Sequence, residues 1–265
     1  MPHVTTALEN GVLTITLDNP PEGLLTGAMV EDLLAVVDGP AGGDTVRCLI
    51  ITGGVSGVFV RHYSGGELLK LSNGLRKAGK TFDEASQVDD HAMNRLTRAI
   101  EALPKPVIAA INGHAMGGGL ELAMACDIRL VEHGEFSIGL PEVNIGLLPG
   151  AGGTQRLARL VGTARALEMA LRGRTIAPAQ AVSMGLAHEL VEDAMARAAE
   201  LAVELAAKPP KAVAHVKRLI RAALPAIDPG TLRLESQLFL DLVTSDEANA
   251  RLAEMAAGER DIRDP

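Results

Sequence analysis

Two glutamates and a run of three glycines lie near the middle of this 265-residue sequence, and they are its clearest candidates for an active site. The glycines, residues 117–119, follow the apolar segment 106–111 and precede the apolar segment 120–126. Glycines at the start of a helix let the backbone approach a ligand, and the helix N-terminus stabilises a negatively charged oxygen. Glu121 would lie in the first turn of that helix, where it could move protons beside the oxygen. The pattern predicts an anion cradle next to an acid/base group.

A second carboxylate follows at Glu142. Pro141 precedes it and predicts a turn, because proline lacks the N–H that a regular strand needs. Apolar neighbours on both sides indicate that Glu142 points into a pocket. Two carboxylates facing one pocket have their pKa values pushed apart, which gives one acid and one base. Taken singly, each glutamate is more often a solvated surface group, but the nearby glycine run favours a shared site.

The motifs around these residues resemble those of the crotonase superfamily, the enoyl-CoA hydratase/isomerase fold, over about residues 3–260. The segments that carry the resemblance are 105–113, 121–127, 141–142, 149–156 and 173–185. The resemblance implies that Glu121 and Glu142 are the two catalytic glutamates. It implies that the backbone N–H groups of Tyr63 and Gly118 form an oxyanion hole, and that the N–H of Gly150 helps to position a water molecule.

The loop before Tyr63 departs from the family pattern. Arg61 and His62 stand where a small residue and a glycine are usual, and Ser64 replaces an acidic residue. Any residue except proline can supply a backbone N–H, so the hole itself need not be lost. We expect Arg61 and His62 to form a substrate loop that alters the shape of the acyl pocket. Direct participation of His62 or Tyr63 in recognition or proton transfer is an alternative.

The composition limits the classes of function. Hydrophobic residues make up 47% of the chain and aromatic residues 2%, which predicts a core of small aliphatic side chains. A net charge of −8 argues against general binding of nucleic acid or of an anionic membrane. Cys48 and Cys126 lack the spacing of a metal site or a disulfide framework, which indicates a reducing compartment. With no secretory signal pattern and no long apolar run, we expect a cytoplasmic enzyme without a metal.

Several helices and strands can be predicted from local patterns. Asn10-Gly11 predicts a hairpin within 3–18, Thr26 caps a helix over 27–37, and Thr81 with Glu84 forms a capping box for a helix reaching Leu103. Further predictions are a strand at 47–52, a glycine-rich loop at 53–66, a turn at 150–153, and helices at 154–160, 192–207, 210–222 and 230–257, the last two separated by 227–230. The basic residues of the later helices could reach coenzyme A phosphates, but a solvated helix face is the favoured interpretation; they are Lys211, Lys217, Arg218 and Arg221.

The order of elements repeats strand, strand and helix, which indicates an α/β protein. The resemblance implies a crotonase-like spiral of repeated ββα units over residues 1–191, which carry the active site. It also implies a C-terminal α-helical oligomerisation region over 192–265 that builds a homotrimer or a dimer of trimers.

The leading hypothesis for function is a 2-enoyl-CoA hydratase of fatty acid metabolism, with coenzyme A as part of the substrate and no separate cofactor. An isomerase that moves a double bond from the 3- to the 2-position needs only one carboxylate, so two glutamates favour hydration without deciding it. Other acyl-CoA chemistries of the superfamily, and a noncatalytic acyl-CoA-binding subunit, are the remaining alternatives.

Overall fold

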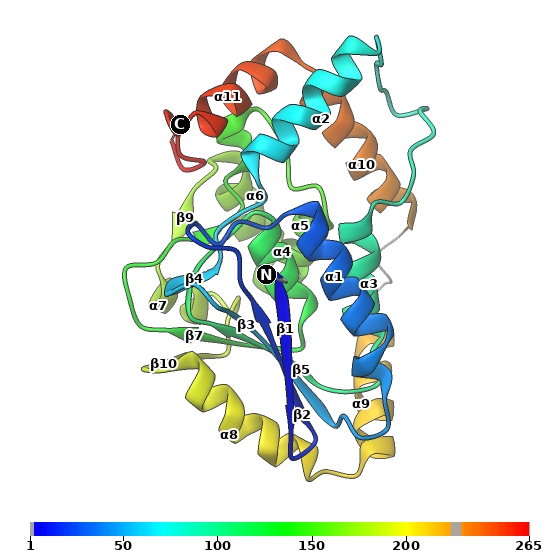
Figure 1. Cartoon of the computed structure of the whole chain (residues 1–265), viewed down its shortest axis with the longest axis vertical. Helices are drawn as coiled ribbons and strands as arrows, with labels where there is room; N and C mark the ends of the chain where they lie inside the picture. The colour runs from blue at the N-terminus through cyan, green and yellow to red at the C-terminus, as the bar shows by residue number, and fades with distance from the viewer. Residues whose placement is uncertain (1–2, 224–228, 265) are drawn as a thin grey trace.

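The computed structural model describes residues 3–223 and 229–264 as two sheets surrounded by helices (Figure 1). The larger sheet has the order β1-β2-β3-β5-β7-β10, with β1 at Val4–Glu9, β2 at Val12–Leu17, β3 at Cys48–Gly53, β5 at Val107–Ile111, β7 at Ile128–Glu132 and β10 at Glu189–Val191. The smaller sheet has the order β4-β6-β8-β9, with β4 at Gly57–Val60, β6 at Gly113–Met116, β8 at Ile138–Gly139 and β9 at Thr175–Ile176. This mixed α/β architecture confirms the α/β class predicted from the order of elements.

The predicted hairpin is confirmed. Strands β1 and β2 pair antiparallel, with Val4 opposite Leu17, and Asn10 and Gly11 have φ of 50° and 78°. A two-residue turn of type I′ needs a positive φ at both positions, which asparagine and glycine tolerate best. The other pairs of the larger sheet are parallel, and its central strands β3 and β5 are buried throughout. Buried parallel strands read as continuous apolar runs, as predicted for 47–52.

Helices make up much of the rest of the described chain. They are α1 at Gly27–Asp38, α2 at Gly65–Lys77, α3 at Ala92–Ala102, α4 at Gly118–Ala125, α5 at Gly153–Val161, α6 at Thr163–Leu171, α7 at Pro178–Ser183, α8 at Ala194–Ala206, α9 at Pro210–Ala223, α10 at Pro229–Val243 and α11 at Asp246–Ala256, with short 3₁₀ helices η1 at Pro40–Gly42 and η2 at Glu142–Ile145. Thr26 caps α1 as predicted, since its side chain accepts a hydrogen bond from the amide of Met29 at 3.2 Å. None of the helices in the described ranges is long and apolar enough to cross a membrane.

Three local predictions were wrong. Residues 81–91 are irregular, and α3 begins only after His91, whose ring caps it, so Thr81 and Glu84 form no capping box. The loop predicted at 53–66 contains β4 and the start of α2, which Ser64 caps by accepting from the amide of Glu67 at 3.3 Å. The helix predicted over 230–257 is two helices, because α10 ends at Val243 and Ser245 caps the start of α11. Part of the separator predicted at 227–230, Ile227 and Asp228, lies outside the described residues.

Helix α8 and the C-terminal helices cover opposite ends of the molecule (Figure 1). Ala194, Ala198 and Ala202 of α8 recur every four residues and are fully buried against the larger sheet, where small side chains allow close packing. At the other end, α2, α10 and α11 lie together over η2. Their shared apolar cluster includes Ile145, Leu147, Val243 and Leu252.

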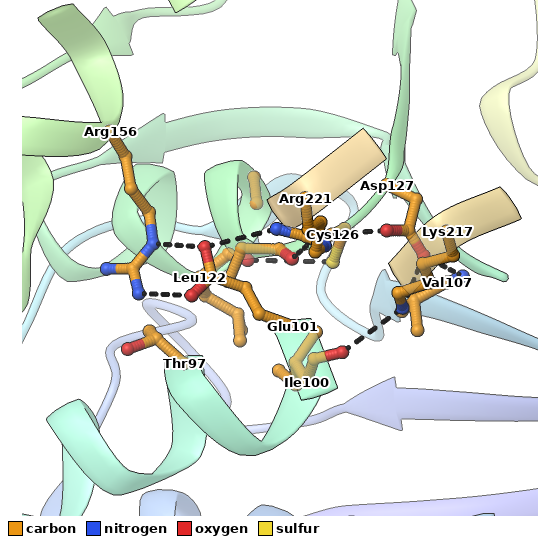
Figure 2. A network of polar contacts seen from close by, with 12 residues as sticks. Thr97, Ile100, Glu101, Val107, Leu122, Cys126, Asp127, Arg156, Lys217 and Arg221 are labelled. Carbon is orange, nitrogen blue, oxygen red and sulfur yellow. Dashed lines mark hydrogen bonds and ion pairs between the residues drawn. The ribbon is translucent and has the colours of Figure 1, made fainter. Parts of the chain in front are cut away.

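Helix α9 is attached to the core by ion pairs, so the solvated-face interpretation was wrong for two of its basic residues (Figure 2). Lys217 Nζ lies 2.7 Å from Asp127 Oδ2, and Arg221 Nη2 lies 2.8 Å from Asp127 Oδ1. Asp127 also accepts from the amide of Val107 at 2.9 Å, at the start of β5. Lys211 and Arg218 are exposed, as that interpretation expected.

Candidate active site

The three glycines at residues 117–119 have different structural surroundings. Gly117 precedes α4 with φ of 50°, and a side-chain carbon added there would lie 2.9 Å from Glu142 Oε1. Gly119 is packed so closely that an added carbon would lie 2.2 Å from the carbonyl oxygen of Val60. Gly118 is the first residue of α4, so the helix begins two residues earlier than the predicted start at Leu120. Its amide therefore lies at the positive end of the helix dipole.

Tyr63 lies next to Gly118. A side-chain carbon built on Gly118 would be 3.8 Å from Tyr63 Cβ, and both residues line the same cavity. Tyr63 pairs with Leu25 in a parallel bridge, in which the amide of Leu25 donates to His62 at 2.9 Å and the amide of Ser64 donates to Leu25 at 2.8 Å. The bridge uses the amides of Leu25 and Ser64. The N–H of Tyr63 takes no part in it and is directed away from Leu25. The structure thus brings Tyr63 and Gly118, from separate parts of the chain, to the same wall of the cavity.

Glu121 is held by the backbone of the turn before α5. Its Oε1 accepts hydrogen bonds from the amides of Ala151 at 2.7 Å and Gly153 at 2.9 Å. The side chain is buried, and burial is the largest cause that raises its pKa to about 7, followed by the negative charge of Glu235. The two amides act in the opposite direction because they stabilise the ionised form. Glu121 can therefore exchange a proton near neutral pH.

Glu142 has a contrasting environment. Pro141 caps η2 and Glu142 begins it, which confirms the predicted turn. The Oε2 atom is buried and has no hydrogen-bond partner among the described residues. Burial, and next the charge of Glu121, raise the pKa of Glu142 well above its ordinary value. Both causes disfavour the ionised form, so Glu142 is a much weaker acid than an exposed glutamate.

The turn at residues 150–153 is the tight connection into α5 that the sequence predicted. Gly152 has φ of 79°, and Arg156 Nη1 donates to the carbonyl oxygen of Ala151 at 2.7 Å. Glu101 in turn holds the guanidinium of Arg156 through two contacts, at 2.9 and 3.0 Å (Figure 2). The carbonyl oxygen of Gly150 accepts from His91 Nε2 at 2.8 Å. The amides that reach Glu121 therefore belong to a turn fixed from several sides.

The two residues of the predicted substrate loop have different positions. His62 is buried and lines the cavity, and its Nδ1 lies 2.9 Å from the carbonyl oxygen of Tyr63. Burial lowers the pKa of His62, so its ring is neutral at neutral pH, with Nδ1 as donor and Nε2 left as an acceptor. Arg61 does not line the cavity. It forms an ion pair with Asp261 at 3.2 Å and so ties this loop to the C-terminal segment.

These residues surround one cavity of about 420 Å³. Its polar wall includes His62, Tyr63, Gly118, Glu121, Glu142 and Gly150. Its apolar wall includes Leu68 and Leu71 of α2, Leu148, Phe239 and Leu240 of α10, and Met255 of α11. An apolar pocket of this kind with a few convergent polar groups is typical of a small-molecule site.

The contributions of α2, α10 and α11 were missed by the sequence analysis. These helices carry no chemical motif, and only the apolar faces of their amphipathic sequences could have indicated that they cover a cavity. Among the described residues, no group of three or more histidine, cysteine, aspartate or glutamate side chains could hold a metal ion.

Comparisons with known proteins agree with this geometry. The model of the enoyl-CoA hydratase/isomerase family matches residues 7–257. The chain is 36% identical over 251 residues to a probable enoyl-CoA hydratase of Bacillus subtilis (strain 168), covering 94% of this chain and 93% of that protein. It is 37% identical over 223 residues to the fatty acid oxidation complex subunit alpha of Shewanella loihica, covering 80% of this chain but 30% of that longer protein.

Solved structures give the same result. The crystal structure of a putative enoyl-CoA hydratase from Streptomyces avermitilis superimposes with a TM-score of 0.83 at 30% identity, covering 97% of this chain and 90% of that one. An enoyl-CoA hydratase/isomerase from Mycobacterium paratuberculosis has a TM-score of 0.84 at 22% identity, covering 96% of this chain and 98% of that one, and shows likeness of fold alone.

Proposed function

Because the chain belongs to the enoyl-CoA hydratase/isomerase family and is an enzyme of that family, we propose that it adds water to 2-enoyl-CoA thioesters. The observation that carries the proposal is the pair of buried glutamates in one cavity. Glu121 has a pKa near neutrality and Glu142 has one well above its ordinary value. One carboxylate and one carboxylic acid at neutral pH are what general base and general acid catalysis need.

The thioester would bind with its carbonyl oxygen between the amides of Tyr63 and Gly118. As water adds to the β-carbon, electrons move through the double bond to this oxygen, which gains negative charge. Amide donors directed at developing charge each contribute about 3 kcal/mol of transition-state stabilisation. The adjacency of these residues, together with the position of Gly118 at the N-terminus of α4, supports this role.

The two glutamates would move the protons. Ionised Glu121 takes a proton from water, whose oxygen forms the new bond to the β-carbon, and Glu142 gives its proton to the α-carbon. The π bond is consumed, one C–O and one C–H bond form, and the net change is the addition of one water molecule. The amide of Gly150, on the rim of the same cavity, would position the water.

The acyl chain would lie against the apolar wall made by α2, α10 and α11. Coenzyme A enters as part of the substrate, and the mechanism needs no separate cofactor. We also propose assembly into a homotrimer or a dimer of trimers. Support comes from α9, where Val216, Leu219 and Ile220 are 56%, 69% and 64% exposed at helical spacing.

A panel of thioester substrates tests the proposed reaction. The conjugated 2-enoyl thioester absorbs in the ultraviolet, and hydration removes that absorbance. We expect loss of the band with 2-enoyl-CoA of several chain lengths. Appearance of the band from 3-enoyl-CoA, without loss from 2-enoyl-CoA, would instead identify an isomerase. Binding of acyl-CoA with no change in either substrate would identify a noncatalytic subunit and overturn the proposal.

A further inference from the structure

A third buried carboxylate lies behind the catalytic pair, on the C-terminal helix α10. Glu235 is 5% exposed, and its Oε1 accepts a hydrogen bond from the amide of Gly152 at 2.5 Å. Its Oε2 accepts from the hydroxyl of Thr154. Glu235 does not line the cavity, although its neighbour Ser236 does. It is therefore placed to act on the site without touching a substrate.

Glu235 and Glu121 accept hydrogen bonds from alternating amides of the same turn. The amides of Ala151 and Gly153 donate to Glu121, while the amide of Gly152, which lies between them in the chain, donates to Glu235. Successive amides can point to opposite sides only if the backbone between them has a specific conformation. Gly152 provides it through a positive φ that other residues rarely adopt. Each carboxylate thus holds the turn in the shape that the other one requires.

The charges around this turn come from several elements. Glu121 lies on α4, Glu142 on η2 and Glu235 on α10, and all three are buried. Arg156 of α5 is a cation that acts on both Glu121 and Glu235, and it is itself paired with Glu101 of α3. His91, at the start of α3, binds the carbonyl oxygen of Gly150, and burial lowers its pKa, so it adds no positive charge at neutral pH. His62, across the cavity, is neutral for the same reason.

We propose that Glu235 is a positioning residue that fixes the 150–154 turn against Glu121 and places a negative charge behind it. This inference rests on the proposed role of Glu121 as the base. The physical cause is repulsion at low dielectric, since a buried anion favours the protonated form of a neighbouring carboxyl group. Burial raises the pKa of Glu235 itself, whereas the hydroxyl of Thr154, the amide of Gly152 and the charge of Arg156 all favour its ionised form. The charge of Glu235 is the largest cause, after burial, that raises the pKa of Glu121 to about 7.

The charge and the geometry can be separated by mutation. Glu235→Gln keeps an oxygen for the amide of Gly152 but removes the charge. We expect the acidic limb of the kcat/KM profile to move to lower pH by about 1 unit, the size of effect that a nearby buried charge produces. Glu235→Ala removes the acceptor as well, and kcat should fall about tenfold or more at every pH because Glu121 loses its alignment. Glu235→Asp keeps the charge and should keep the acidic limb near that of the wild type.

Two further variants complete the set. Thr154→Val has nearly the shape of threonine and removes a donor that favours the ionised form of Glu235. It should move the acidic limb in the same direction as Glu235→Gln, but less. Asp241→Asn removes the same charge from an exposed position on α10 and should leave the profile unchanged.

A direct titration distinguishes failure of this inference from failure of the proposed function. The carboxyl stretching band of Glu121 is obtained by infrared spectroscopy from the difference between the wild-type protein and Glu121→Gln. Its midpoint should fall in Glu235→Gln whether or not the protein hydrates enoyl-CoA. A midpoint that falls in a protein without hydratase activity would overturn the proposed function alone. An unmoved midpoint in both Glu235→Gln and Thr154→Val would overturn the inference.

Discussion

Glu121 and Glu142 face one cavity but are held in opposite ways. Glu121 Oε1 accepts two backbone hydrogen bonds, whereas Glu142 Oε2 is buried without a hydrogen-bond partner among the described residues. Amide donors stabilise a carboxylate, and an unpartnered buried oxygen is tolerated far better on a neutral carboxyl group. The difference in hydrogen bonding therefore supports the proposed roles of Glu121 as the base and Glu142 as the acid.

Replacing either glutamate by glutamine should remove most of the activity. Glu121→Gln and Glu142→Gln keep the size of the side chain but cannot exchange the proton, so kcat with 2-enoyl-CoA should fall between a hundred- and ten-thousand-fold. Initial rates from the loss of enoyl absorbance measure this. Glu135→Gln, at an exposed position, is the matched control and should retain full activity. Wild-type rates in both active-site variants would remove these side chains from the mechanism.

The same assignment fixes the pH dependence of the reaction. Glu121 must be ionised, and its pKa of about 7 predicts that kcat/KM rises as the pH increases through neutrality. Glu142 must be protonated, and its pKa, well above its ordinary value, predicts a fall on the alkaline side. Rates between pH 5 and 10 should thus describe a bell. An acidic limb near pH 4.5, the ordinary value for glutamate, would mean that Glu121 is not desolvated in solution.

Stability should show the cost of burying Glu121. The pKa of Glu121 is about 7 in the folded state, compared with an ordinary value of 4.5 for the unfolded chain. Ionisation of Glu121 therefore destabilises the folded state above pH 7, and this penalty falls as the pH decreases toward 4.5. A difference of this size corresponds to on the order of 3 kcal/mol. Glu121→Gln should therefore raise the free energy of unfolding at pH 8, and much less at pH 5. Denaturant titrations at both pH values check this, and equal effects would contradict it.

The sequence predicted well what local chemistry determines. Asn10-Gly11 could only make a tight hairpin between its flanking strands, and Pro141 before Glu142 could only begin a turn. The glycines at 117–119 indicated a close backbone approach, and the structure shows one at Gly117 and Gly119, where an added carbon would lie 2.9 and 2.2 Å from its nearest neighbour. These features depend on backbone conformations that few other residues adopt, so they are visible in the residues themselves.

Contacts distant in the sequence could not be predicted in this way. Glu235 and the apolar residues of α10 reach the site only because the C-terminal helices fold back over η2, and no local pattern encodes that return. Lys217 and Arg221 resembled a solvated face because helical spacing does not reveal a partly buried aspartate elsewhere in the chain. Ser64 before Gly65-Gly66-Glu67 was a capping signal, but the adjacent glycines concealed the helix.

Helix α9 should depend on the ion pairs to Asp127 for its attachment. Lys217→Met leaves Asp127 paired with Arg221. We expect the free energy of unfolding to fall by about 2 kcal/mol. This loss is smaller than for a fully buried pair because Asp127 is partly exposed. The catalytic cavity is not lined by α9, so kcat/KM should stay within a few-fold of the wild-type value. Arg218→Met, exposed on the same helix, should change neither quantity. Equal stability of the two variants would show that the pairs contribute nothing.

The glycines before and within α4 should respond to substitution in a graded way. Gly119→Ala should destabilise the fold most, because the added carbon would lie 2.2 Å from a backbone oxygen that cannot move aside. Gly117→Ala should spare more of the fold but lower kcat, since its added carbon would lie 2.9 Å from Glu142 Oε1 and its φ of 50° disfavours alanine.

Two substitutions of Gly118 distinguish the role of its backbone N–H from the effect of a larger side chain. Gly118→Ala keeps the N–H and meets only the end of a leucine side chain at 3.2 Å, so activity should fall less than tenfold. Gly118→Pro removes the N–H at the first position of α4, where proline is compatible with a helix. Loss of one such donor should lower kcat by about a hundred- to a thousand-fold. Circular dichroism separates this effect from unfolding, and a folded Gly118→Pro enzyme with the rate of Gly118→Ala would exclude this amide from transition-state stabilisation.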